Sequence, residues 1–142
     1  MEKDPSDLAY ELALDARPIA VFERWVDPLL LPTWMGAVAT LVPEPGGLFR
    51  LEYSSGDVAE GRYVEVDPPR RLAFTWGWVG EADFPPGSST VEVDLEAVGS
   101  AATKLRLRHI GVRPELRDNV DAGWGYFLPR LVTALAGAGE TT

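Results

Sequence analysis

The 142-residue sequence contains no cysteine and only one histidine, His109. Without cysteine the chain can form no disulfide, no thiolate nucleophile and no metal site with sulfur ligands. A single histidine cannot build a site from several imidazoles or a relay of two histidines. We therefore expect no bound metal and no cofactor.

Basic charge is also scarce, because 13 Lys and Arg face 22 Asp and Glu and give a formal net charge of −9. Nucleic acids and anionic membranes bind basic surfaces, so both are excluded as partners. The first ten residues, MEKDPSDLAY, lack the apolar core of a signal peptide. The longest uncharged run, 28–43, is too short for a membrane-spanning helix and is interrupted by prolines. We expect a soluble cytoplasmic protein.

The length fits a single domain spanning residues 1–142. Folding a chain of this size buries about two-thirds of its surface, which is enough for one core with a cavity but not for two cores. The small and polar residues 137–142 are expected to form a disordered end.

Alternation of apolar and polar residues predicts seven strands, at 8–14, 37–42, 48–53, 58–66, 71–78, 90–98 and 103–111. The last two are separated by a short loop, which predicts a hairpin. The acidic outer face of one would lie beside the basic outer face of the other. We interpret both charge runs as a solvated face stabilised by cross-strand pairs, and not as a binding patch.

Helical spacing appears in three other segments. Pro18 suits the first position of a helix over 18–26, and Asp27-Pro28 begins a second short helix that Pro32 limits. Apolar residues three and four apart predict a long helix over 116–135, which must cover the apolar face of the sheet. The order is one strand, two short helices, six antiparallel strands and one long helix, an α+β arrangement.

Five segments match a known family in order and spacing: RPIAVFERWVDPLLLPTWMG (17–36), PGGLFRLEY (45–53), GRYVEVDPPRRLAFTW (61–76), STVEVDLEAVGSAATKLRLRHIG (89–111) and DAGWGYFLPRL (121–131). Together they resemble the activator of heat-shock protein 90 ATPase homologue-like family. That family belongs to the START-like superfamily, also called SRPBCC or birch-pollen-allergen-like helix-grip. The VDPPRRLAFTW block and the Gly123-Trp124 pair are the most specific parts.

The resemblance implies a helix-grip fold, in which a curved seven-stranded antiparallel sheet grips the C-terminal helix. It also implies a cavity for an apolar small molecule between sheet and helix. The superfamily includes polyketide cyclases and aromatases, so the fold alone does not fix the function. The family name comes from a eukaryotic co-chaperone. A chain of this length could match only the C-terminal domain of that protein, so chaperone activation does not transfer with the name.

The C-terminal helix carries Gly123 and Gly125 around Trp124, and Pro129 in its interior. Glycine costs about 1 kcal/mol and proline about 3 kcal/mol inside a helix. We expect the glycines to let the helix approach the sheet closely, and Pro129 to kink the helix just before it. Alternatively, one short helix ends at Gly123 and another begins near Gly125. Both versions place Trp124 at the cavity wall.

Candidate ligand contacts are large side chains expected on the inner face or at the cavity entrance. Aromatic rings with a polar tip suit an apolar or aromatic ligand that must be oriented. The alternative for each residue is an ordinary core position. The candidates are Trp34, Met35, Phe49, Tyr53, Phe74, Trp76, Trp124, Phe127 and Leu128.

Three polar residues complete the candidate site. His109 belongs to the inward face of the last strand, where it either bonds a backbone carbonyl or anchors a ligand. Val64 and Val66 are expected to face inward, which would carry Glu60 and Arg62 to the same side. Glu60 and Arg62 would then pair at the cavity mouth or extend past the sheet edge. No catalytic residue is assigned.

Three functions remain open. The first is an apolar small-molecule binding protein. The second is a cyclase- or hydrolase-type enzyme that would use Arg62, Glu60 or His109. The third is a chaperone-associated interaction module, which predicts a filled core and a large exposed apolar patch. A homodimer is also compatible with the sequence, because apolar loops such as 80–86 would be exposed.

Overall fold

The protein is described by a computed structural model over residues 7–140, with side chains described as far as residue 136. The elements follow one another as β1 (Leu8–Leu14), α1 (Pro18–Val26), the 3-10 helix η1 (Leu31–Thr33), β2 (Val38–Leu41), β3 (Leu48–Glu52), β4 (Val58–Asp67), β5 (Arg71–Trp76), β6 (Ser89–Val98), β7 (Ala102–Ile110), the 3-10 helix η2 (Pro114–Leu116) and α2 (Arg117–Glu140). This order confirms the α+β prediction, with two short helices after the first strand. Pro32 lies in the first turn of the second helix, so the prediction that Pro32 limits this helix is wrong.

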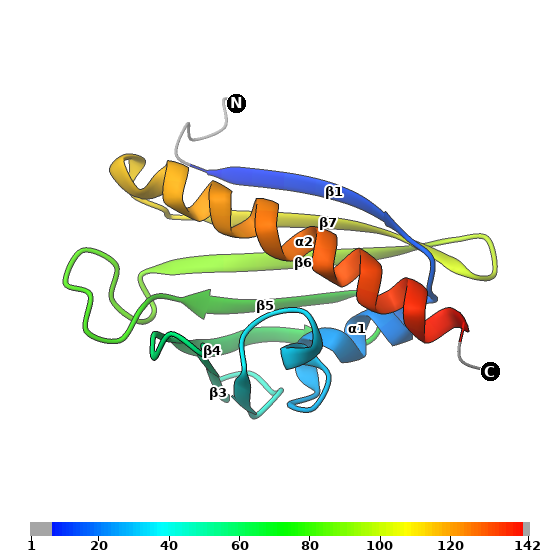
Figure 1. The fold of residues 1–142 in the computed structure, drawn as a ribbon, viewed down its shortest axis with the longest axis horizontal. Coiled ribbons are helices and arrows are strands. Elements are labelled where there is room, and N and C mark those ends of the chain that lie inside the picture. Colours follow the sequence, from blue (N-terminus) through cyan, green and yellow to red (C-terminus); the bar gives the residue numbers. More distant parts are fainter. Residues whose placement is uncertain (1–6, 141–142) are drawn as a thin grey trace.

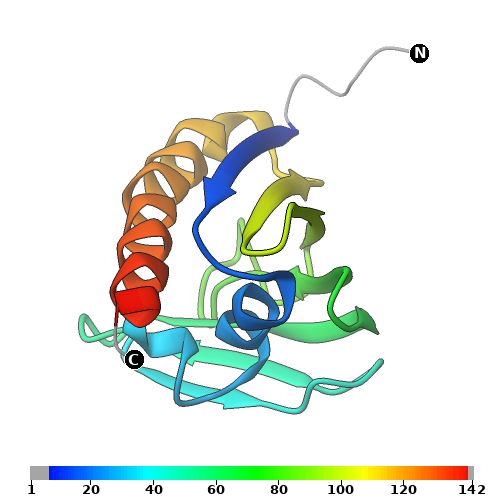
Figure 2. The same cartoon turned by 90° about the vertical axis from the view of Figure 1, so that its right-hand side faces the viewer.

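The seven strands form one antiparallel sheet in the order β1-β7-β6-β5-β4-β3-β2. The first strand therefore pairs with the last, and β1 and β2 are the two edges. Figure 1 shows α2 lying across the sheet, and Figure 2 shows the sheet curving around it. Within residues 7–140, no helix combines the length and the apolarity that a bilayer crossing requires.

The β6–β7 hairpin follows the predicted alternation. Thr103, Leu105, Leu107 and His109 all point inward, and none is more than 1% exposed. The outward charges lie opposite one another in register, as predicted, in the pairs Glu92–Arg108, Asp94–Arg106 and Glu96–Lys104. The sheet therefore turns charge outward and apolar surface toward α2.

The predicted orientation of β4 is wrong. Ala59, Gly61 and Tyr63 are buried, whereas Val64 is 54% exposed. The cause is a register shift against β5 between residues 63 and 65, where one additional residue reverses which side chains face inward. Alternation counted from Val66 toward the start of β4 therefore assigns the residues before the bulge to the wrong face of the sheet.

Helix α2 runs without a break from Arg117 to Glu140, so the alternative of two short helices is wrong. The expected close approach at the glycines is also wrong, because a Cβ atom at Gly123 or Gly125 would meet no atom within 4 Å. Pro129 and Gly125 are both exposed, so the carbonyl that loses its helical partner can bond water. The disorder predicted for 137–142 concerns residues whose side chains, and for 141–142 the backbone, lie outside the described part.

Close approach of backbone occurs instead at Gly61 in β4. A Cβ atom there would lie 1.9 Å from the carbonyl oxygen of Thr75 in β5. We expect Gly61→Ala to lower the free energy of unfolding by about 1–3 kcal/mol through overpacking. Gly125→Ala should instead raise it by about 1 kcal/mol, because alanine favours the helix and the position is open. Urea denaturation of both variants tests this, and a Gly61→Ala protein as stable as the wild type would contradict it.

Candidate functional site

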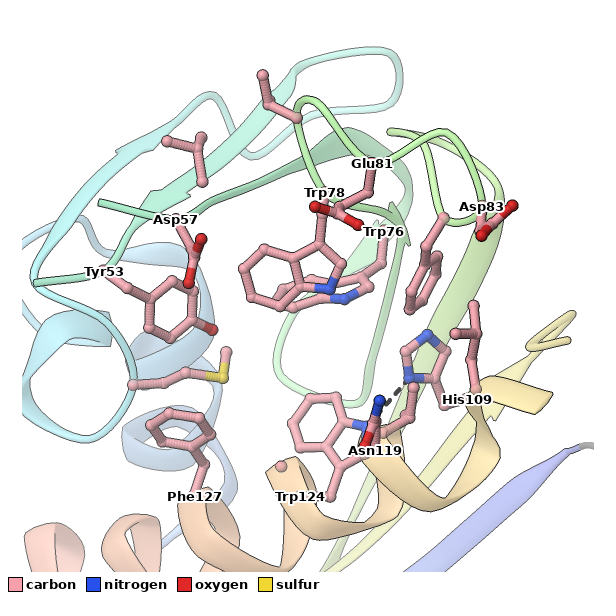
Figure 3. Close-up of a pocket in the computed structure, with 17 residues that line it drawn as sticks. Tyr53, Asp57, Trp76, Trp78, Glu81, Asp83, His109, Asn119, Trp124 and Phe127 are labelled. Atoms are coloured by element: carbon pink, nitrogen blue, oxygen red, sulfur yellow. Dashed lines mark hydrogen bonds between the residues drawn. The ribbon is translucent and has the colours of Figure 1, made fainter. Parts of the chain in front are cut away.

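A cavity of about 390 Å³ lies between the inner face of the sheet and the first half of α2 (Figure 3). It is bounded by the ends of β3 and β5, by β7, and by the loops that follow β3 and β5. Its lining residues are Met35, Tyr53, Asp57, Val58, Trp76, Trp78, Val79, Glu81, Asp83, Phe84, His109, Leu116, Asn119, Val120, Gly123, Trp124 and Phe127. The volume falls within the range of about 300–1,000 Å³ that is usual for small-molecule sites.

Aromatic rings in mutual contact form the wall of the cavity. Trp78 lies 5.4 Å from Tyr53 and 5.5 Å from Trp76, measured between ring centroids. Phe127 of α2 completes the wall at 5.8 Å from Tyr53. Tilted and edge-on contacts at such distances are the favourable arrangements of aromatic pairs, so the rings hold one another in place.

A chain of buried hydrogen bonds ties α2 to the sheet beside the cavity. The indole Nε1 of Trp124 lies 3.0 Å from Nδ1 of His109, and Nε2 of His109 lies 2.8 Å from Oγ of Ser89. The hydroxyl of Ser89 donates to the carbonyl oxygen of Trp76 at 2.9 Å. We call this chain, Trp124–His109–Ser89–Trp76, the indole latch (Figure 3 draws its first bond).

The indole latch fixes the tautomer of His109. An indole N–H can only donate, so Nδ1 must accept with its lone pair. The ring proton is therefore on Nε2 and is donated to Ser89, whose own proton goes to the Trp76 carbonyl. Every donor in the chain has one acceptor. A protonated imidazole would turn an N–H toward the N–H of Trp124.

Burial lowers the pKa of His109 from its usual 6.5 to about 4. Between these two values the unfolded chain binds more protons than the folded one, so the free energy of unfolding rises with pH. The contribution of neutral, buried His109 to the free energy of unfolding is complete above pH 6.5 and is lost as the pH falls to 4. This loss amounts to about 3 kcal/mol.

The hydroxyl of Tyr53 and the indole N–H groups of Trp76 and Trp78 have no hydrogen-bond partner among the described residues. Burial raises the pKa of Tyr53, so its hydroxyl stays protonated. These groups are not sealed in the core, in contrast to the N–H of Trp25. The cavity therefore offers unused hydrogen-bond donors between its aromatic rings.

Half of the candidate contacts chosen from the sequence line the cavity: Met35, Tyr53, Trp76, His109, Trp124 and Phe127. Trp34, Phe49, Phe74 and Leu128 are instead buried core residues, in agreement with the alternative given for them. Trp34 and Phe74 pack against Trp25 of α1, with ring centroids 4.7 and 6.2 Å apart. Phe49 and Phe74, for example, stack on each other with centroids 4.1 Å apart.

Glu60 and Arg62 do not line the cavity. Because of the bulge in β4, Glu60 lies on the outer face, where it pairs with Arg50 at 2.8 Å. Arg62 is exposed and lies 3.5 Å from the carbonyl oxygen of Gly46. β5 and β6 separate Glu60 from His109, so the two groups cannot work as an acid–base pair.

The sequence prediction missed the residues that two loops and the start of α2 contribute. The loop after β5 folds back, so that the N–H of Trp78 bonds the carbonyl of Phe84 at 2.7 Å. Gly77 permits this, because a Cβ atom there would lie 1.8 Å from the carbonyl oxygen of Pro85. In the sequence, the glycine between the two tryptophans of TWGW was the feature that could have indicated this fold-back of the loop.

Comparison with protein families matches residues 15–136 to the family described as "Activator of Hsp90 ATPase homolog 1-like protein". The chain belongs to this family. This confirms the family resemblance and the START-like helix-grip fold. A search of curated protein sequences gave no significant match.

Three solved structures share the fold of this member of the Hsp90-activator-like family. MLL2253 from Mesorhizobium loti is 22% identical with a TM-score of 0.81, over 92% of this chain and 96% of that one. PFC0360w, an HSP90 activator from Plasmodium falciparum, is 23% identical with a TM-score of 0.76, over 92% and 96%. The Aha1 dimer from Colwellia psychrerythraea is 14% identical with a TM-score of 0.78, over 91% and 95%. At these identities the likeness concerns the fold.

The neutral state of His109 can be observed directly, because it is the one histidine of this family member. We expect its imidazole NMR signals to show no titration between pH 8 and about 5, and the nitrogen shifts to show a proton on Nε2. The stability advantage of the wild type over His109→Gln should shrink by about 3 kcal/mol between pH 6.5 and 4. A titration midpoint near 6.5 would contradict the latch.

Proposed function

We propose that this protein binds an apolar or aromatic small molecule in the cavity between the sheet and α2. The observation that carries the proposal is the aromatic cavity of about 390 Å³, whose rings keep unused hydrogen-bond donors. Concave, mainly apolar sites with a few placed polar groups are the usual form of small-molecule sites.

Gly123 supports this proposal, because it lines the cavity and a Cβ atom there would meet nothing within 4 Å. Its missing side chain therefore leaves space in the cavity and serves no close packing. Glycine weakens a helix by about 1 kcal/mol relative to alanine, so stability alone does not account for it.

The two alternative functions have less support. Of the three residues that the enzyme function would use, His109 has both ring nitrogens bonded within the indole latch. Glu60 and Arg62 lie outside the cavity. An interaction module predicts a filled core, and the open cavity argues against that. PFC0360w is described as an HSP90 activator. A chaperone partner is therefore the next function to test if no ligand binds.

Filling the cavity from α2 tests the proposal. We expect saturable binding of the neutral apolar dye N-phenylnaphthylamine to the wild type, measured by dye fluorescence. Gly123→Leu should weaken this binding at least about tenfold, because its side chain occupies the ligand space. Leucine favours a helix, so the variant should remain folded.

Gly125→Leu is the matched control, because Gly125 lies on the same helix but is exposed and does not line the cavity. This variant should bind the dye as the wild type does. Absence of saturable binding to the wild type, or equal losses in both variants, would refute the proposed site.

A homodimer and a cytoplasmic location remain predictions. The Colwellia relative is described as a dimer. In this chain the loop after β5 covers one side of the cavity, with Val79 49% exposed and Phe84 buried. Sedimentation velocity would test the oligomeric state, and a single monomer peak at high concentration would exclude a stable homodimer.

A further inference from the structure

The charges that line the cavity are all negative among the described residues. Asp57, Glu81 and Asp83 contribute carboxylates, and no lysine or arginine lines it. Asp83 is neutralised in part by Arg113 at 3.4 Å. Asp57 and Glu81 have no cationic partner in the described part of the chain, and the carboxylate of Asp57 accepts only from the hydroxyl of Ser55 at 2.9 Å.

The two unpaired carboxylates lie on neighbouring loops beside Trp78. Ala59 and Trp78 form an isolated bridge, and the N–H of Val79 donates to the carbonyl of Val58 at 2.9 Å. Asp57 directly precedes this junction, and the N–H of Glu81 bonds the carbonyl of Trp78 at 3.2 Å. Both carboxylates are exposed, so they mark the mouth of the cavity next to an indole ring (Figure 3).

Inside the mouth, the indole N–H of Trp76 is an independent sign of a ligand. Trp76 is only 6% exposed, yet this N–H has no acceptor among the described residues. The N–H of Trp34, by comparison, donates to the carbonyl of Arg24 at 3.0 Å. In Figure 3 the nitrogens of Trp76 and Trp78 lie on the ring edges turned toward α2. Unlike the N–H of Trp25, that of Trp76 is not sealed in the core, so a ligand or water in the cavity can accept from it.

Positive potential beside the cavity comes from Arg113, which is paired with Asp83, and from the N-terminus of α2. Its first turn carries Asp118, which offsets the helix dipole. The helix places Asn119, Val120 and Gly123 on the cavity, and none of them is charged. Among the described residues that line the cavity, Asp57 and Glu81 therefore carry the charges that no cation neutralises.

We propose that the cavity takes a flat aromatic cation, with its rings between Tyr53, Trp76 and Phe127 and its protonated amine at Asp57 and Glu81. A carbonyl or ether oxygen of the ligand accepts from the N–H of Trp76. The face of Trp78 adds cation–π attraction at the mouth. An anionic ligand would meet two carboxylates without a compensating cation. This inference rests on the proposed function and narrows it to a class of ligand.

Three anthraquinones that differ in one substituent test the inference: an aminomethyl cation, a neutral hydroxymethyl compound and a carboxylate. Calorimetric titration of the full chain at low salt should give binding in the order cation, neutral, anion, with about tenfold or more between the first and last. The preference should weaken in high salt, because exposed charges are screened.

Glu81→Gln and Asp57→Asn should each weaken binding of the cation several-fold and leave the neutral compound unchanged. Glu44→Gln is the matched control. It removes the same charge from an exposed position in the turn at the opposite end of β3, and it should change nothing.

The outcomes separate the two proposals. Equal binding of all three compounds, or a preference that Glu81→Gln and Asp57→Asn do not alter, overturns the charge assignment while the cavity stands. Binding of none of the three, together with no uptake of N-phenylnaphthylamine, overturns both.

Discussion

The hydrogen bonds of the indole latch are the constraint on which the cavity depends. They join four elements, because Trp124 comes from α2, His109 from β7, Ser89 from β6 and the accepting carbonyl from the end of β5. A buried donor or acceptor left without its partner costs about 1–3 kcal/mol, so these hydrogen bonds stabilise the fold only when all of them form. The indole latch fixes the spacing between helix and sheet where apolar contacts alone would allow sliding.

Beside the indole latch, the space between α2 and the sheet is left open as a cavity and is not filled by core side chains. The far part of the sheet is filled by α1, by η1 and by rings such as Phe49 and Phe74. The near part is not filled, because Gly123 offers no side chain and the loop after β5 is held back against Gly77. The aromatic rings of the wall support one another through edge contacts and do not need a partner across the cavity.

Charged residues are balanced on the outer face of the sheet but not at the cavity mouth. On the outer face of the sheet, acidic and basic residues neutralise one another, as between Arg71 and Asp94 at 2.9 Å. Each such exposed pair contributes little to stability, yet together they leave the outer face without a strong field. At the cavity mouth the carboxylates of Asp57 and Glu81 lack such partners within the described residues. Negative charge is thus left without neighbouring positive charge at the place where a ligand would enter.

The sequence by itself determined the elements and most of the sheet orientation, because the two-residue and 3.6-residue periods depend only on local backbone geometry. It placed His109 on the inner face of β7 and Trp124 at the cavity wall. Tertiary structure decided what depends on distant contacts. A bulge moved Glu60 and Arg62 outward, since one extra residue reverses a strand's parity. Loop folding placed Asp57 and Glu81 on the same cavity, although 24 positions separate them in the chain. The bonds of His109 to Ser89 and Trp124 join strands and a helix whose spacing no local pattern specifies.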